Sequence, residues 1–273
     1  MVAAALGLGL LVGLIIGALG GGGSILTVPL LVFAIGLSAQ QATSASLVIV
    51  GIAAVVASLS HARSGHTAWR TGLLLSAAGV PASVLGTRLN RLVEEDVLLV
   101  AFSVVMLVAA AGMILRSAHV HDSAEEHPGS QAPRPGGGGT LTAVRPPRLR
   151  SRRGRTLKLV AAGLVIGFLT GFLGVGGGFV IVPVLVVALD ITMPVAVGTS
   201  LLVIALNSGV ALLARAGQGG FAWEVIVPFT LTAVAGSVLG KRISDRLPAV
   251  ILTRSFAVLL VLVAGYVAVR ALI

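Results

Sequence analysis

The chain carries the stretch Gly-Ala-Leu-Gly-Gly-Gly-Gly-Ser-Ile-Leu-Thr-Val-Pro at residues 17–29, in the middle of a long apolar region. A related stretch, Gly-Phe-Leu-Gly-Val-Gly-Gly-Gly-Phe-Val-Ile-Val-Pro, occupies residues 171–183. The two copies lie 154 residues apart, and each interrupts an apolar segment with glycines. A membrane helix that is broken by glycines once in each half of a chain is the best sequence indication of a transporter's binding site.

The composition requires lipid as the solvent. Of the 273 residues, 56% are hydrophobic and only 10% are charged, and the mean hydropathy is +1.07. A soluble protein carries roughly 25% charged residues. The chain has no cysteine, which excludes disulfides and thiolate metal sites. We therefore expect an all-α polytopic membrane protein.

The repeat extends over both halves in one register. At the offset of 154 residues it pairs Gly13 with Gly167, Pro29 with Pro183, Ser46 with Ser200, Trp69 with Trp223 and Arg88 with Arg242. We predict a first repeat at residues 1–117, a disordered basic linker rich in Pro and Gly at 118–156, and a second repeat at 157–273.

The number of membrane crossings depends on two short apolar segments, 25–37 and 179–191. As helices they would be about 20 Å long, too short to cross a bilayer core of about 30 Å. We join each to its predecessor across the glycines, as one broken or re-entrant element. The prediction is then two homologous halves of four elements, about eight membrane helices in all. Four crossings per half make the repeats parallel, which we favour, whereas five would make them inverted.

The net charge of +10 is concentrated between the two halves. Eight of the 19 basic residues lie there: Arg134, Arg145, Arg148, Arg150, Arg152, Arg153, Arg155 and Lys158. No aromatic residues alternate with them, so nucleic acid is not expected as a partner. We expect contact with anionic lipid headgroups and a positive-inside signal. With eight elements, the termini and the linker share one side, which the basic residues place in the cytoplasm of a cell whose inner (plasma) membrane holds the protein.

The glycine runs are the candidate binding site for an anion. A break frees backbone N–H groups at the start of the next half-helix, where the helix dipole is positive. The candidate residues are Gly20, Gly21, Gly22, Gly23 and Ser24 in the first copy, and Gly174, Gly176, Gly177 and Gly178 in the second. The alternative is that the glycines only allow helices to pack closely.

Hydroxyl groups follow each run and could complete the site. They belong to Thr43, Ser44, Ser46, Thr199 and Ser200. Alternatively, they bond back to their own helix. Asn207 lies in the middle of an apolar segment and needs a partner there, either the substrate or a neighbouring helix. Arg88 and Arg242 could recruit anions at the outer mouth, or they could extend into the headgroups.

Catalysis has no support in the sequence. There is no Ser-His-Asp arrangement, no His-Glu-x-x-His motif and no pair of carboxylates on one helix face. The glycine runs do not match a nucleotide-binding loop either, since no strand precedes them. We expect no enzyme activity, no cofactor and no metal.

The chain resembles the sulfite exporter TauE/SafE family, also described as four-TMS sulfate/anion permeases. The resemblance rests on residues 13–29, 42–47, 61–65 and 83–88 and on their second copies at 167–183, 196–201, 215–219 and 237–242. It implies a bacterial inner-membrane carrier, an exporter, of sulfur-containing anions such as sulfite or organosulfonates. A channel or carrier for another small solute, or a membrane scaffold acting through the basic linker, is the alternative. A homo-oligomer is compatible with this reading.

Overall fold

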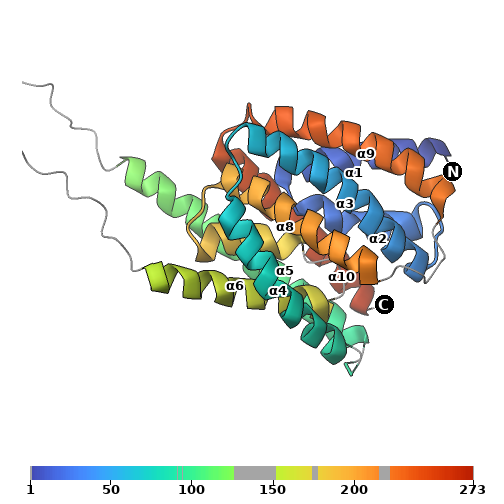
Figure 1. The fold of residues 1–273 in the computed structure, drawn as a ribbon, viewed down its shortest axis with the longest axis horizontal. Coiled ribbons are helices and arrows are strands. Elements are labelled where there is room, and N and C mark those ends of the chain that lie inside the picture. The colour runs from blue at the N-terminus through green and yellow to red at the C-terminus, as the bar shows by residue number, and fades with distance from the viewer. Residues whose placement is uncertain are drawn as a thin grey trace, which may run out of the picture.

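The computed structural model describes residues 2–90, 92–93, 95–125, 152–173, 178–214 and 222–272, and these form a bundle of helices (Figure 1). The all-α architecture is as predicted. The first half contains α1 (Val2–Leu19), α2 (Gly22–Phe33), α3 (Ala39–Arg63), α4 (Trp69–Asn90) and α5 (Glu95–Glu125). The second half contains α6 (Arg152–Leu173), α7 (Gly178–Pro183) with the π-helical turn η1 (Val184–Ala188), α8 (Met193–Ala214), α9 (Trp223–Ser244) and α10 (Ala249–Leu272).

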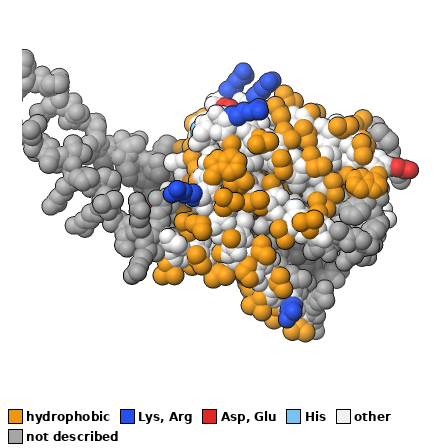
Figure 2. All heavy atoms as spheres, in the orientation of Figure 1, with side chains coloured by type: hydrophobic (Ala, Val, Ile, Leu, Met, Phe, Trp, Pro, Cys, Tyr) orange, Lys and Arg blue, Asp and Glu red, His pale blue; other side chains and the backbone are white. Residues whose placement is uncertain are grey.

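The length and apolar character of the helices suit a membrane. Four of them, α3, α8, α9 and α10, contain apolar spans long enough to cross the bilayer. Large hydrophobic side chains such as Val108 and Leu262 are more than 60% exposed. Figure 2 shows hydrophobic side chains spread over much of the visible face. In water such a surface would drive aggregation, whereas in a bilayer it faces lipid tails.

The first glycine run makes the chain reverse direction. Gly20 has a φ of +73°, a conformation that favours glycine. A Cβ atom on Gly23 would lie 2.3 Å from Ile16 Cγ1 and 2.9 Å from Val12 O, so α2 folds back along α1. The structure therefore shows the re-entrant form of the predicted element. Since α1 and α2 run in opposite directions, each half contains five directional segments rather than the predicted four.

The odd number of segments inverts the second half relative to the first. The equivalent helices α3 and α8 are antiparallel: Gly51 in the middle of α3 packs on Ser208 in the second half of α8, and Gly198 near the start of α8 packs on His66 just after α3. Our preference for parallel repeats was wrong. The two halves are instead related by an approximate two-fold axis that runs across the helices.

The halves also exchange helices. Gly13 and Gly17 of α1 pack against Ala233 and Ser237 of α9, and a Cβ on either glycine would lie about 2 Å from a carbonyl oxygen of α9. The equivalent residues Gly167 and Gly171 of α6 pack in the same way against Gly79 and Ser83 of α4. These glycines let backbones approach closely, as small residues do in membrane bundles. Each half is completed by a helix of the other.

The ends of the bundle differ from the prediction as well. The end of α1 lies beside the end of α3, because His61 Nε2 is 3.1 Å from Gly17 O. The chain then turns into α4, and α6 runs parallel to α4, with Gly163 beside Leu75 and Gly171 beside Ser83. Hence α6 begins at the end of the bundle opposite to Val2, and both termini lie away from the linker (Figure 1). The expectation that termini and linker share one side was wrong, because it rested on an even number of segments.

The helices extend into the predicted linker. α5 continues to Glu125 and α6 begins at Arg152, so both enter the range 118–156. The predicted disorder of residues 126–151 falls outside the described residues.

Candidate functional site

The two glycine runs meet inside the bundle. A Cβ on Gly21 would lie only 1.7 Å from Gly178 O, and a Cβ on Gly178 would lie 2.5 Å from Ser24 Oγ. Ser24 and Gly178 are equivalent positions of the repeat, separated by 154 residues. Because equivalent residues can touch only near the symmetry axis, this contact places the starts of α2 and α7 on the axis.

The start of α2 presents its backbone to this junction. Its N-cap residue is Gly21, which supplies no capping side chain. The first N–H groups of a helix, here those of Gly22 and Gly23, have no acceptor within the helix. The Ser24 hydroxyl donates to Gly21 O at 2.7 Å and is buried. The local dipole favours an anion here.

The second copy is described only from Gly178 onward. Gly174, Gly176 and Gly177 fall outside the described residues. α7 is six residues long and continues at Pro183 into the π-helical turn η1. Such turns are frequent at functional sites in helices. The structure thus joins Gly178 to the first glycine run.

Ser200 connects the glycine turn to α8. A Cβ on Gly20 would lie 2.6 Å from Ser200 Oγ, so the hydroxyl group fills the space that a side chain at position 20 would need. Ser200 is fully buried and donates to Val197 O at 2.8 Å. The predicted neighbour relationship between the glycine run and this hydroxyl is therefore present.

The other hydroxyls have mostly local partners. Ser46 donates to Thr43 O at 2.9 Å, which repeats the bond of Ser200 in the other half. Thr199 Oγ1 accepts from Ala68 N at 3.1 Å and so holds the segment before α4 against α8. Ser44 is buried as well. The bonds of Ser46 and Ser200 match the local alternative, whereas that of Thr199 joins two segments remote in the sequence. Each of these hydroxyl oxygens still has a lone pair for a donor.

Asn207 lies at the middle of α8, where the first half has Ala53. Its Oδ1 is buried and has no hydrogen-bond partner among the described residues. A buried acceptor without a donor is costly, about 1–3 kcal/mol. The neighbouring Ser208 packs on Gly51, so this part of α8 faces α3 near the axis.

The two predicted recruiting arginines are far apart. Arg88 lies in the last turn of α4, and Arg242 lies in the last turn of α9. α4 runs along α6 away from the linker, whereas α9 runs along α1 toward it. Because the repeats are inverted, one mouth cannot hold both side chains.

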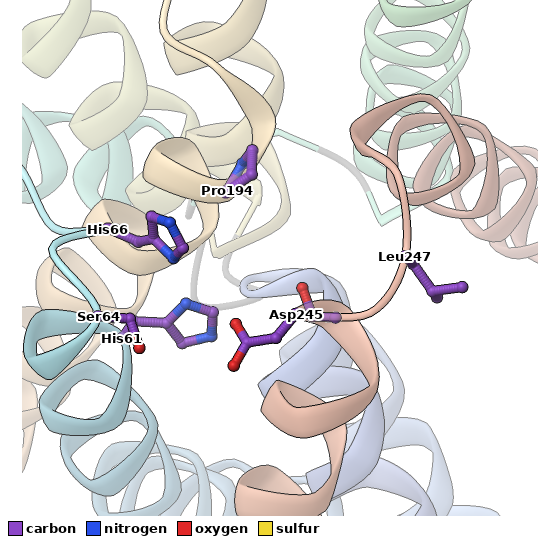
Figure 3. Close-up of a pocket in the computed structure, with 7 residues that line it drawn as sticks. His61, Ser64, His66, Pro194, Asp245 and Leu247 are labelled. Carbon is purple, nitrogen blue, oxygen red and sulfur yellow. The ribbon is translucent and has the colours of Figure 1, made fainter.

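A pocket at the linker end was missed by the sequence reasoning. It has a volume of about 200 Å³ and is lined by His61, Ser64, His66, Pro194, Ser244, Asp245 and Leu247 (Figure 3). Lys241 Nζ donates to Ser64 Oγ at 2.8 Å and forms an ion pair with Asp245. The only sequence signal was the segment 61–65, which begins with His61 and is followed directly by His66. The other residues that line the pocket come from remote helix ends.

The geometry shows glycine-broken helices of two inverted repeats meeting inside a membrane bundle, and the family comparison agrees with it. The family described as "Sulfite exporter TauE/SafE" matches residues 5–267. The chain belongs to the TauE/SafE family. Members of this family are membrane transporters, and this chain is a membrane transporter of that type rather than an enzyme.

Relatives of this TauE/SafE protein match it along nearly its whole length. A "Probable membrane transporter protein" of Xylella fastidiosa (strain Temecula1 / ATCC 700964) is 31% identical over 266 residues, which cover 96% of this chain and 93% of the relative. "Probable membrane transporter protein YunE" of Bacillus subtilis (strain 168) is 24% identical, with 94% and 93% covered. "Probable membrane transporter protein MJ0441" of Methanocaldococcus jannaschii is 22% identical, with 87% and 86% covered. No solved structure matches the chain.

Proposed function

We propose that this TauE/SafE protein is a secondary carrier that exports small sulfur-containing anions, such as sulfite or an organosulfonate. The family description, which names sulfite export, supports this substrate class. The observation that carries the site is the contact of Ser24 with Gly178, which brings the glycine runs of both halves together on the axis. The anion binds there, at the start of α2.

Backbone groups rather than charged side chains hold the anion. In this proposal, the N–H groups of Gly22 and Gly23 donate to the anion, and the positive end of the α2 dipole stabilises its charge. No described Lys or Arg is buried. A site without a permanent positive charge binds an anion weakly enough to release it, which a carrier needs.

Hydroxyl and amide groups near the axis complete the proposed shell. Ser24 borders the start of α2, and Ser200 borders Gly20. Thr43, Ser44, Ser46 and Thr199 supply further polar atoms on the following helices. The unpartnered Asn207 on α8 is a group that substrate or water would satisfy.

Inverted repeats give this carrier a route to alternating access. Two halves with the same fold in opposite orientations can each adopt either of two conformations, and the halves can swap these conformations. The exchange would close the site to one side and open it to the other. The close glycine contacts between α1 and α9, and between α4 and α6, make each of these pairs a rigid unit.

The corrected topology also gives a clear orientation. Of the 13 Lys and Arg residues in the described segments, 11 belong to the helix ends and connections on the linker side. The other two are Arg88 and Arg270. Most of the Lys and Arg side chains visible in Figure 2 lie toward the left and upper edge, on the linker side. By the positive-inside rule, we place the linker end in the cytoplasm, against anionic headgroups, and the termini on the opposite side of the inner membrane.

Flux into or out of proteoliposomes tests this function. The purified chain is reconstituted, and sulfite, sulfoacetate, thiosulfate and sulfate are each offered. Gly21→Ala is compared with Gly209→Ala, because a Cβ on Gly209 would meet nothing within 4 Å. We expect flux of at least one anion in the wild type and in Gly209→Ala, and none in Gly21→Ala. Equal flux in both variants would refute the site, and no flux of any anion would refute the substrate class.

A further inference from the structure

The pocket at the linker end contains a histidine with an unused ring nitrogen. His61 is 1% exposed, and its Nε2 lies 3.1 Å from Gly17 O. A carbonyl oxygen only accepts, so Nε2 carries the hydrogen and Nδ1 of the neutral ring is an acceptor. Nδ1 is buried and has no hydrogen-bond partner among the described residues. It is therefore a vacant position for a proton.

His61 is unusual in this bundle. Among the residues that the structure describes, it is the one buried side chain that can titrate, since the other buried polar residues are Ser and Thr. It lies in the last turn of α3, at the end of the apolar span Gln41–Arg63. Ionisable residues inside membrane spans are rare and commonly mark ion or proton pathways.

The position of His61 connects it to the glycine junction, the place where Gly21 and Ser24 meet Gly178. Gly17, its bonding partner, lies one helical turn before the Gly20 turn, which leads into α2. We propose that His61 binds a proton that is transported together with the anion. Protonated at Nδ1, the ring becomes a cation close to the place where the anion binds. Each ligand then favours the binding of the other, and the coupling is reciprocal.

The pocket gives the proton a path from the linker end. The groups that face His61 are Lys241 from the last turn of α9, and Asp245 and His66, which line the pocket beside His61 in Figure 3. Lys241 and Asp245 form an ion pair, so their opposite charges largely offset each other at His61. Pro194 of α8 and Gly17 of α1 add no charge. Water that enters the pocket can pass a proton inward to His61.

The test rests on the proposed function and uses His61→Gln. Glutamine can still donate an amide hydrogen to Gly17 O, but it cannot take up a proton. The matched control is His66→Gln in the same pocket. The full chain is reconstituted in proteoliposomes with the membrane voltage clamped at zero and with sulfite, sulfoacetate, thiosulfate or sulfate at equal concentration on both sides. Protein-free liposomes correct for leakage.

A pH gradient of one unit is then imposed, which is a tenfold proton gradient. With one proton per anion, the wild type and His66→Gln should accumulate the anion about tenfold on the alkaline side. His61→Gln should exchange labelled anion across the bilayer without accumulating it. Accumulation in His61→Gln equal to that of the wild type would overturn the proposal, as would exchange without accumulation in the wild type.

If no anion of the set is transported, that result refutes the proposed function but does not test His61. A second measurement therefore tests His61 independently of transport. The imidazole nitrogens of ¹⁵N-labelled protein are followed by NMR over about pH 5 to 8, and the His61 signal is assigned by its loss in His61→Gln. Uptake of a proton at Nδ1 in this pH range supports His61 as a proton-binding site. A ring that stays neutral over the whole range refutes it.

Discussion

Ser24 of α2 and Gly178 of α7 occupy equivalent positions in the two halves and lie in contact, with Ser24 Oγ in the place that a side chain on Gly178 would need. This pair marks the symmetry axis. It also explains why the two copies differ here, because only one hydroxyl fits between the two helix starts.

Exchanging the pair tests the symmetry directly. Gly178→Ser alone places a second hydroxyl against Ser24, and we expect flux to fall by at least tenfold. The double variant Ser24→Gly with Gly178→Ser moves the single hydroxyl across the axis and should recover most of the flux. The measurement is a double-mutant cycle on initial rates in proteoliposomes. Strictly additive losses would show that the two positions do not share one space.

The close helix pairs predict a stability effect that is equal in both halves. In Gly13→Ala and Gly167→Ala, the new Cβ would lie 2.0 Å from Ala233 O and 2.1 Å from Gly79 O, respectively. Overpacking of this kind typically costs about 1–3 kcal/mol. Thermal unfolding in detergent should therefore show a lower midpoint for both variants. Gly265→Ala is the control, since a Cβ there meets nothing within 4 Å. An effect in only one half would contradict the equivalent packing of α1 with α9 and α6 with α4.

The inverted topology predicts labelling from opposite sides. The chain has no cysteine, so single cysteines can be introduced cleanly. Leu92 follows α4 and is 81% exposed, and Leu247 follows α9 at the linker end and is 36% exposed. A membrane-impermeant maleimide added to intact cells should label Leu92→Cys, and it should reach Leu247→Cys only after permeabilisation. Parallel repeats would instead give both positions the same accessibility.

The linker should be dispensable for flux. Replacing residues 126–151 with a Gly/Ser stretch of equal length removes Arg134, Arg145, Arg148 and Arg150 but leaves α5 and α6 intact. We expect unchanged initial rates in proteoliposomes, because the glycine junction lies inside the bundle. Normal flux would also argue against a scaffold acting through the linker, whereas loss of flux in a stably folded protein would assign the linker a part in transport.

The sequence predicts the composition of the site better than its topology. The glycine runs, their repeat offset and the hydroxyl of Ser200 were all identified, because glycine density and register are visible in a single chain. The orientation of the halves was not, because segment length cannot show whether the chain continues or reverses at Gly20. That depends on a positive φ and on the packing of Gly23 against Ile16. The placement of Arg88 and Arg242 at one mouth failed for the same reason.

The pocket around His61 shows a second limit. Its polar groups come from the ends of α3 and α9, and its bonding partner Gly17 comes from α1. No local motif joins these residues, because helix exchange between the halves brings them together. Sequence patterns report a helix face well, but they do not report which remote helix ends meet.

The most direct test of the central claim is anion binding to purified Ser24→Asp, with Ser24→Asn as the isosteric neutral control. Aspartate and asparagine have the same size, so both variants crowd Gly178 to the same extent. The helix dipole offsets part of the cost of burying the carboxylate. The same carboxylate occupies and repels the proposed anion site. Equilibrium binding of the transported anion should be abolished in Ser24→Asp and at least partly retained in Ser24→Asn. Equal binding by the two variants would contradict an anion site at the start of α2.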